Sequence, residues 1–209
     1  MAKNKKTVPK SYSDFTVDNL KDMFGIVDRL QALELNKQEL LPSDWLLTTL
    51  SIQKKLPQGT EKAKSELRIA PILMELHSRN AHKFTFFSGY TFDVDASKSL
   101  TGRCDFLLIK EAYSTNIEAP IIGIFEAKDD NIDKWIGQCG AEMYAARLFN
   151  EQHNEAINII YGAVTNGNEW LFLKLAENIL YVDTEVYSIR NLAELLGALQ
   201  TLIDFYSPV

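Results

Sequence analysis

The hydrophobic pattern in the middle of the chain is that of strands. Short continuous apolar runs favour strands buried on both faces, and alternation favours strands with one polar face. The signal Thr165-Asn166-Gly167-Asn168 predicts a hairpin between two of them. Strands are predicted at 84–94 (with a bend or bulge at Ser88-Gly89), 102–109, 120–126, 157–164, 170–173 and 180–187.

Helical spacing of apolar residues appears on both sides of this region. An N-terminal helix is predicted from Thr16 through Phe24 to Leu30, while 46–56 is ambiguous. Thr60 is a candidate cap for a helix that begins at Glu61 and runs to about His77, kinked or divided by Pro71. Two further helices are predicted, one capped by Asp130 or Asn131 and apolar at 132–146, and one at 192–205.

The order of these elements predicts an α/β fold. A helix between the strands at 120–126 and 157–164 favours their parallel pairing, and the three earlier strands favour a meander. The expected architecture is a mixed β-sheet flanked by helices. We expect one domain over 11–209, with an N-terminal helical extension and a disordered basic tail at 1–10.

Composition is that of an ordinary soluble domain: 46% of the 209 residues are hydrophobic and 24% are charged. No apolar run is long enough to span a bilayer, and the basic N-terminus lacks the apolar segment of a secretory signal. Cys104 and Cys139 are expected to be free, buried thiols in a reducing cytoplasm, although a disulfide is not excluded. The expectation is therefore a cytoplasmic protein without a membrane partner.

The formal net charge of −6 argues against a broad electropositive surface for nucleic acid. It is compatible with a local basic groove, or with a cation that neutralises the acids. Candidates for a groove are Lys54-Lys55, Lys62, Lys64 and Arg68, although scattered surface charges are the usual interpretation.

Candidate chemistry is concentrated at Glu126-Ala127-Lys128, the only acid-x-Lys sequence in the chain. Alternation along the strand directs Glu126 and Lys128 to the same side. Asp105 lies in another apolar strand, where an unpaired acid costs several kcal/mol. Two acids and a lysine on adjacent strands suit a divalent cation and an activated water.

Each of these residues has a plainer interpretation. Glu126 and Lys128 would simply end a strand in solvent, and Asp105 would pair with Arg103, two residues away. For acids in the helix after Thr60, among them Glu66 and Glu75, a solvated charge is the default.

Taken in order, these residues resemble the restriction-endonuclease-like, or PD-(D/E)XK, nuclease superfamily. The resemblance covers roughly residues 60–175. It includes a helix with Ser65-Glu66-Leu67-Arg68-Ile69-Ala70-Pro71, strands with Asp105 and Glu126-Ala127-Lys128, and a helix with Gln138. Residues 164–170 are similar to the hairpin after the core in stand-alone members and restriction-subunit nuclease domains.

The resemblance implies a ligand set for Mg²⁺ or Mn²⁺. Asp105 and Glu126 would bind the metal, with the carbonyl of Ala127, and Glu66 would bind it directly or through water. Lys128 would position or help to deprotonate the attacking water. Gln138 would be a further site residue, as in members with Gln-x-x-x-Tyr.

The chain departs from the family pattern in two places. No proline precedes Asp105, which the family tolerates. Glu142 stands where the Gln138 motif would have tyrosine, and Tyr144 falls two residues late.

The expected function is metal-dependent hydrolysis of phosphodiester bonds, with DNA the first candidate substrate. A non-cleaving nucleic-acid-binding or regulatory module of the same fold, and a protein-interaction module, remain alternatives. A homodimer or a larger restriction or defence complex is left open.

Overall fold

A seven-stranded mixed sheet forms the centre of the computed structural model, which describes residues 8–35, 38–80, 83–128 and 131–207. The strand order is β1-β7-β6-β5-β4-β3-β2. The strands are β1 (Val27–Leu30), β2 (Thr85–Thr91), β3 (Arg103–Ile109), β4 (Ile121–Ala127), β5 (Ile159–Thr165), β6 (Glu169–Ala176) and β7 (Ile179–Ser188).

Strand pairing confirms the predicted α/β topology. Strands β2, β3 and β4 form an antiparallel meander. Helix α5 (Ile136–Gln152) then connects β4 to β5, and these two strands pair in parallel. Strands β5, β6 and β7 continue as antiparallel neighbours, which confirms the hairpin at residues 166–168.

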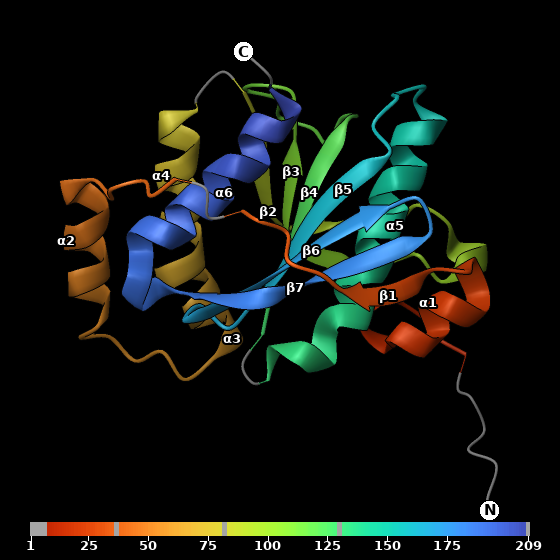
Figure 1. Ribbon diagram of the computed structural model, residues 1–209, viewed down its shortest axis with the longest axis horizontal. Coiled ribbons are helices and arrows are strands. Elements are labelled where there is room, and N and C mark those ends of the chain that lie inside the picture. Colours follow the sequence, from red (N-terminus) through yellow and green to blue (C-terminus); the bar gives the residue numbers. More distant parts are fainter. Residues whose placement is uncertain (1–7, 36–37, 81–82, 129–130, 208–209) are drawn as a thin grey trace, which may run out of the picture.

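Helices cover both faces of the sheet (Figure 1). Helices α4 (Ala70–Arg79) and α6 (Leu192–Tyr206) pack on one face, through a core that includes Ile72, Phe125 and Leu199. Helix α1 (Val17–Phe24) and α5 lie on the other, where Leu20 and Ile124 are fully buried. An apolar core on each face explains why the central strands read as continuous apolar runs.

The N-terminal helix is shorter than predicted, and its last residues form a strand instead. Thr16 caps α1, but Gly25 adopts a left-handed φ of 69° and the helix ends at Phe24. The main-chain N–H groups of Gly25 and Ile26 close the helix by donating to Lys21 and Leu20. Val27 and Leu30 then lie in β1, which pairs in parallel with β7.

The helix predicted after Thr60 is one helix with a π segment in its middle. Thr60 accepts a hydrogen bond from the N–H of Ala63 and caps α3 (Glu61–Lys64), as predicted. The π segment η2 (Ser65–Ile69) follows and leads directly into α4. Pro71 has no N–H to donate, so the wider turn before it absorbs the disruption. Helix α2 (Asp44–Gln53), capped by Ser43, resolves the ambiguous region.

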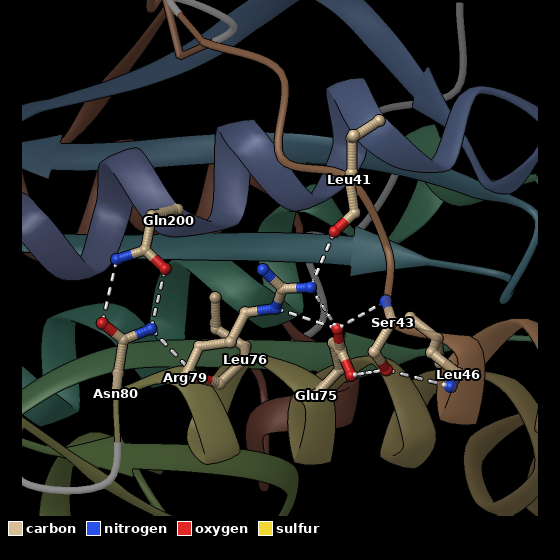
Figure 2. Close-up of polar contacts among 8 residues, drawn as sticks. All are labelled: Leu41, Ser43, Leu46, Glu75, Leu76, Arg79, Asn80 and Gln200. Carbon is tan, nitrogen blue, oxygen red and sulfur yellow. Dashed lines mark hydrogen bonds and ion pairs between the residues drawn. The ribbon is translucent and has the colours of Figure 1, made fainter.

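A buried carboxylate fixes the start of α2 to α4 (Figure 2). Glu75 accepts from the main-chain N–H of Ser43 at 3.0 Å, from its hydroxyl at 2.6 Å, and from Arg79 at 2.6 and 2.8 Å. Arg79 also donates to the carbonyl of Leu41 at 2.7 Å. Glu75 is 3% exposed, which corrects the expectation of a solvated charge.

Several expectations concern the ends of segments. The predicted tail falls mostly outside the described residues, but Pro9 is buried and its carbonyl accepts from Ser99 Oγ at 2.8 Å. Asp130 also lies outside them, whereas Asn131 accepts from the N–H of Asp133.

Both cysteines are buried and free. None of the helices in the described ranges is long and apolar enough to cross a membrane.

Candidate active site

The candidate site lies where β3 and β4 separate. Regular pairing of the two strands begins at Phe106 opposite Phe125. One residue further out, Asp105 Oδ2 accepts from the main-chain N–H of Ala127 at 2.8 Å. The half-buried Asp105 carboxylate therefore takes the place of a main-chain acceptor and lies against the middle residue of the acid-x-Lys tripeptide.

Glu126 and Lys128 lie together inside the protein rather than in solvent. Their exposed fractions are 2% and 8%, and Lys128 Nζ lies 2.7 Å from Glu126 Oε1. Lys128 Nζ also lies 4.4 Å from the centre of the Trp135 ring, in cation–π contact. The main-chain N–H of Lys128 donates to Thr165 at 2.8 Å, which fixes the tripeptide to β5.

Helix α5 adds two polar side chains to this pair. Gln138 Nε2 donates to Glu126 Oε1 and, at 3.0 Å, to Glu142 Oε1. We call Glu126, Lys128, Gln138 and Glu142 the buried cluster. Sequence reasoning missed Glu142, although its four-residue spacing from Gln138 already placed both on one helix face. Tyr144, the weaker candidate, instead packs against Phe24, with the ring centres 4.5 Å apart.

Three oxygens in the buried cluster have no hydrogen-bond partner: Glu126 Oε2, Gln138 Oε1 and Glu142 Oε2. Buried polar atoms are normally satisfied, so such a group indicates a missing proton, water or ion. The cluster thus has unused capacity to bind a donor or a cation.

Burial raises the pKa of both carboxyl groups in the cluster. Desolvation is the largest cause for Glu126, and the charges of Glu142 and Asp105 add to it, while Lys128 opposes it. Desolvation also raises the pKa of Glu142 to about 8, against the opposing effect of the hydrogen bond from Gln138. Glu126 accepts from both Lys128 and Gln138. We therefore assign the negative charge to Glu126 and treat Glu142 as the protonated, neutral carboxyl group of the cluster.

Lys128 keeps its positive charge despite burial. Desolvation lowers its pKa, but the charge and hydrogen bond of Glu126, with smaller effects from Glu61 and Asp105, outweigh it and raise the pKa. A fixed cation is therefore present beside the two strand acids.

Glu66 is placed differently from the strand acids. It lines a hollow of about 330 Å³, which we call the Asp105 hollow, and its side chain is 63% exposed, 3.7 Å from Lys62. Arg103, the alternative partner of Asp105, donates to the carbonyl of Gly89. The lining residues are Glu61, Lys62, Ser65, Glu66, Ser88, Gly89, Arg103 and Asp105.

The structure thus brings the predicted residues into two groups. Asp105 and Glu66 share the Asp105 hollow, while Glu126, Lys128 and Gln138 form the buried cluster. Asp105 connects the two groups, because its carboxylate accepts a hydrogen bond from the main-chain N–H of Ala127, between Glu126 and Lys128. Within the described ranges, no three His, Cys, Asp or Glu residues are gathered as a metal site. The donors are nevertheless the hard oxygens that Mg²⁺ and Mn²⁺ prefer, and Glu126 Oε2 is a buried acceptor without a partner.

A scan against models of known protein families gave no match, and a comparison with curated proteins gave no relative.

Proposed function

We propose that this protein is a metal-dependent nuclease that hydrolyses phosphodiester bonds, with DNA as its first candidate substrate. The observation that carries the proposal is the hydrogen bond from Ala127 to Asp105, which brings an acid of β3 beside Glu126 and Lys128. Glu126 Oε2, without a partner inside the buried cluster, supports it. A strand end that serves only to terminate a sheet needs neither feature.

The proposal gives each side chain a separate task. Asp105 and Glu126 would hold the cation with the carbonyl of Ala127, and Glu66 would assist through water from the Asp105 hollow. Gln138 orients Glu126 by donating to its Oε1. Bound Mg²⁺ or Mn²⁺ would lower the pKa of a water and draw electron density from the phosphate.

Lys128 would position the attacking water and stabilise the charge that develops on the phosphate oxygens. Its pairing with Glu126 and its contact with Trp135 hold the ammonium in one place. A preorganised cation of this kind typically contributes a factor of about 10² to 10³ in rate.

Cleavage assays test the proposal directly. Supercoiled, linear and single-stranded DNA and RNA are incubated with the protein and Mg²⁺, Mn²⁺ or chelator. We expect metal-dependent cleavage that Lys128→Ala and Lys128→Gln slow by about 10²-fold or more. Lys21→Ala, an exposed lysine of α1, is the matched control and should cleave at the normal rate.

The two Lys128 variants separate loss of function from loss of fold, because Lys128→Gln retains a hydrogen-bond donor for Glu126. Both should show the helical circular dichroism of the original protein. If the original protein binds metal yet cleaves none of these nucleic acids, the proposal fails, and a non-cleaving module of the same fold replaces it.

A further inference from the structure

A second hollow, with a volume of about 370 Å³, lies between α2, η2, the β5–β6 hairpin and the start of α6. We call it the basic hollow because three cationic side chains, Lys54, Arg68 and Arg190, line it. Its described lining contains no Asp or Glu. The lining residues are Leu47, Leu50, Ser51, Gln53, Lys54, Gln58, Arg68, Asn168, Ile189, Arg190 and Leu192. In a chain of net charge −6, such a concentration of positive charge is a local exception.

Arg68 is held at the wall of this hollow by neutral groups. Its Nε donates to Gln58 Oε1 and its Nη1 donates to Asn168 Oδ1. The stem packs against the hairpin at Gly167, where a Cβ would lie 3.0 Å from Arg68 Cδ. Neutral partners fix the guanidinium without cancelling its charge, so it remains available to an anion.

Gln53 supplies an independent indication of a ligand. It lines the basic hollow, it is only 4% exposed, and its Oε1 has no hydrogen-bond partner. A buried amide oxygen normally accepts a hydrogen bond, so a ligand with an N–H group that enters the hollow would supply the donor that Gln53 Oε1 lacks. Leu50 and Leu192, both buried, provide an apolar surface beside it.

The basic hollow lies next to the candidate active site. The hairpin that carries Asn168 begins at Thr165, whose carbonyl accepts from the N–H of Lys128. On the helix, Ser65 and Glu66 line the Asp105 hollow, while Arg68 lines the basic hollow. One helical segment therefore connects the two hollows, and the hairpin connects the basic hollow to Lys128.

We infer that the basic hollow binds one nucleotide of the nucleic-acid strand, next to the phosphate that is cleaved. The base lies on the apolar surface with an N–H group donating to Gln53, and Lys54, Arg68 and Arg190 hold the flanking phosphates. This inference rests on the proposed function, and it adds a role for α2, which precedes the region of family resemblance. The polar contacts of Glu75 hold the start of α2 in place for this role (Figure 2).

Binding measured without metal tests the inference separately from catalysis. The full chain is titrated against a fluorescein-labelled 20-nucleotide single-stranded DNA in chelator, by fluorescence anisotropy at several salt concentrations. The double variant Lys54→Ala/Arg190→Ala should bind roughly tenfold more weakly. The slope of log binding constant against log salt concentration should be smaller in magnitude by about 1.4, since each lost phosphate contact on a single strand reduces that slope by about 0.7.

Two further variants sharpen the result. Gln53→Leu removes an acceptor but no charge, so it should lower affinity about fivefold and leave the salt dependence unchanged. Lys21→Ala, which removes a lysine from α1 on the opposite face, should bind like the original protein. Thermal melts establish that every variant is folded.

The outcomes distinguish this inference from the proposed function. If the original protein cleaves DNA but the double variant binds it with unchanged affinity and salt dependence, the inference fails and the function stands. If binding depends on the basic hollow but no cleavage occurs, nucleotide binding in the basic hollow stands, whereas the nuclease proposal fails together with the placement beside a cleaved phosphate. A nucleoside monophosphate that competes as tightly as the oligonucleotide would overturn the strand-binding role.

Discussion

Glu75 on one side of the sheet and the pair Glu126 and Glu142 on the other are buried carboxyl groups whose pKa values shift in opposite directions. Glu75 is satisfied by Ser43 and Arg79, and although burial raises its pKa, these hydrogen bonds and the charge of Arg79 lower it overall (Figure 2). Glu126 and Glu142 lie deeper in the protein, each keeps one oxygen without a partner, and desolvation is the largest cause of their raised pKa values. Burial raises the pKa in all three groups, and only around Glu75 are the hydrogen bonds and the opposite charge strong enough to outweigh it.

The difference also separates a structural role from a functional one. The donors around Glu75 connect α2 to α4, so its charge is already used to hold two helices together. The buried cluster has more acceptors than donors, which is an unfavourable arrangement unless a proton, a water or a cation completes it.

The largest expected effect is the pH dependence of stability without metal. The pKa of Glu142 is about 8 in the folded protein, above its ordinary value of 4.5. The folded protein therefore retains a proton that the unfolded chain releases, and the free energy of unfolding should fall as the pH rises from about 4.5 to 8. We expect a loss of up to about 4 kcal/mol, measured by urea denaturation in chelator.

Glu142→Gln should remove most of this slope, because the amide carries no charge at any pH in the range. A free energy of unfolding that stays level between pH 5 and 8 in the original protein would show that Glu142 is not held protonated, and the contrast with Glu75 would be lost.

The same substitution at Glu75 should destabilise the protein more than it does at Glu142. Glu75→Gln removes the charge opposite Arg79 and puts an amide where four donor groups converge, so it should cost about 2–3 kcal/mol at pH 6. Glu142→Gln is the matched control and should cost less than about 1 kcal/mol there, because the group it replaces is already neutral. Equal costs in urea denaturation would contradict the comparison.

The smallest expected effect is the response to metal. Mn²⁺ at about ten times its dissociation constant should raise the melting temperature of the original protein by about 3–5 °C. Asp105→Asn retains an acceptor for the N–H of Ala127, so it should melt at or above the original protein in chelator and lose most of the shift. Thermal melts with chelator and with Mn²⁺ measure both quantities.

Glu75→Gln serves as the control for this experiment. It should melt lower but keep the full metal-induced shift, since Glu75 belongs to the other group. A normal shift in Asp105→Asn would remove Asp105 from the proposed ligand set.

Much of the fold could be predicted because its signals are local. The apolar run before Glu126, the hairpin at Gly167 and the helix that begins near Asn131 are each recognisable within a few residues. Together they predicted the parallel pairing of β4 and β5. The apolar spacing of Val27 and Leu30 predicts a longer N-terminal helix, but Gly25 ends the helix at Phe24 and this spacing does not reveal it.

The same local signals predicted part of the candidate site. Alternation placed Glu126 and Lys128 side by side, and the structure brings them to 2.7 Å. The role of Glu142 could not be seen in this way, because its sequence does not distinguish it from a solvated acid. The close approach of α5 to β5 puts it in the interior: at Gly162 a Cβ would lie 2.5 Å from Met143 Sδ, so a larger residue there would require Met143 to move.

The sequence by itself therefore determined most of the elements, though not β1 or α2, and which polar side chains leave the same strand or helix face. Tertiary structure alone decided that Glu75 would be surrounded by donors and that Glu142 would not. It also decided that Glu66 would stay with Asp105 in an open hollow, apart from Glu126, and that α2 would bring Lys54 to the same hollow as Arg68 and Arg190. The physical reason is that periodicity reports only neighbours along the chain, whereas the charge of a buried group depends on atoms that packing brings from distant segments.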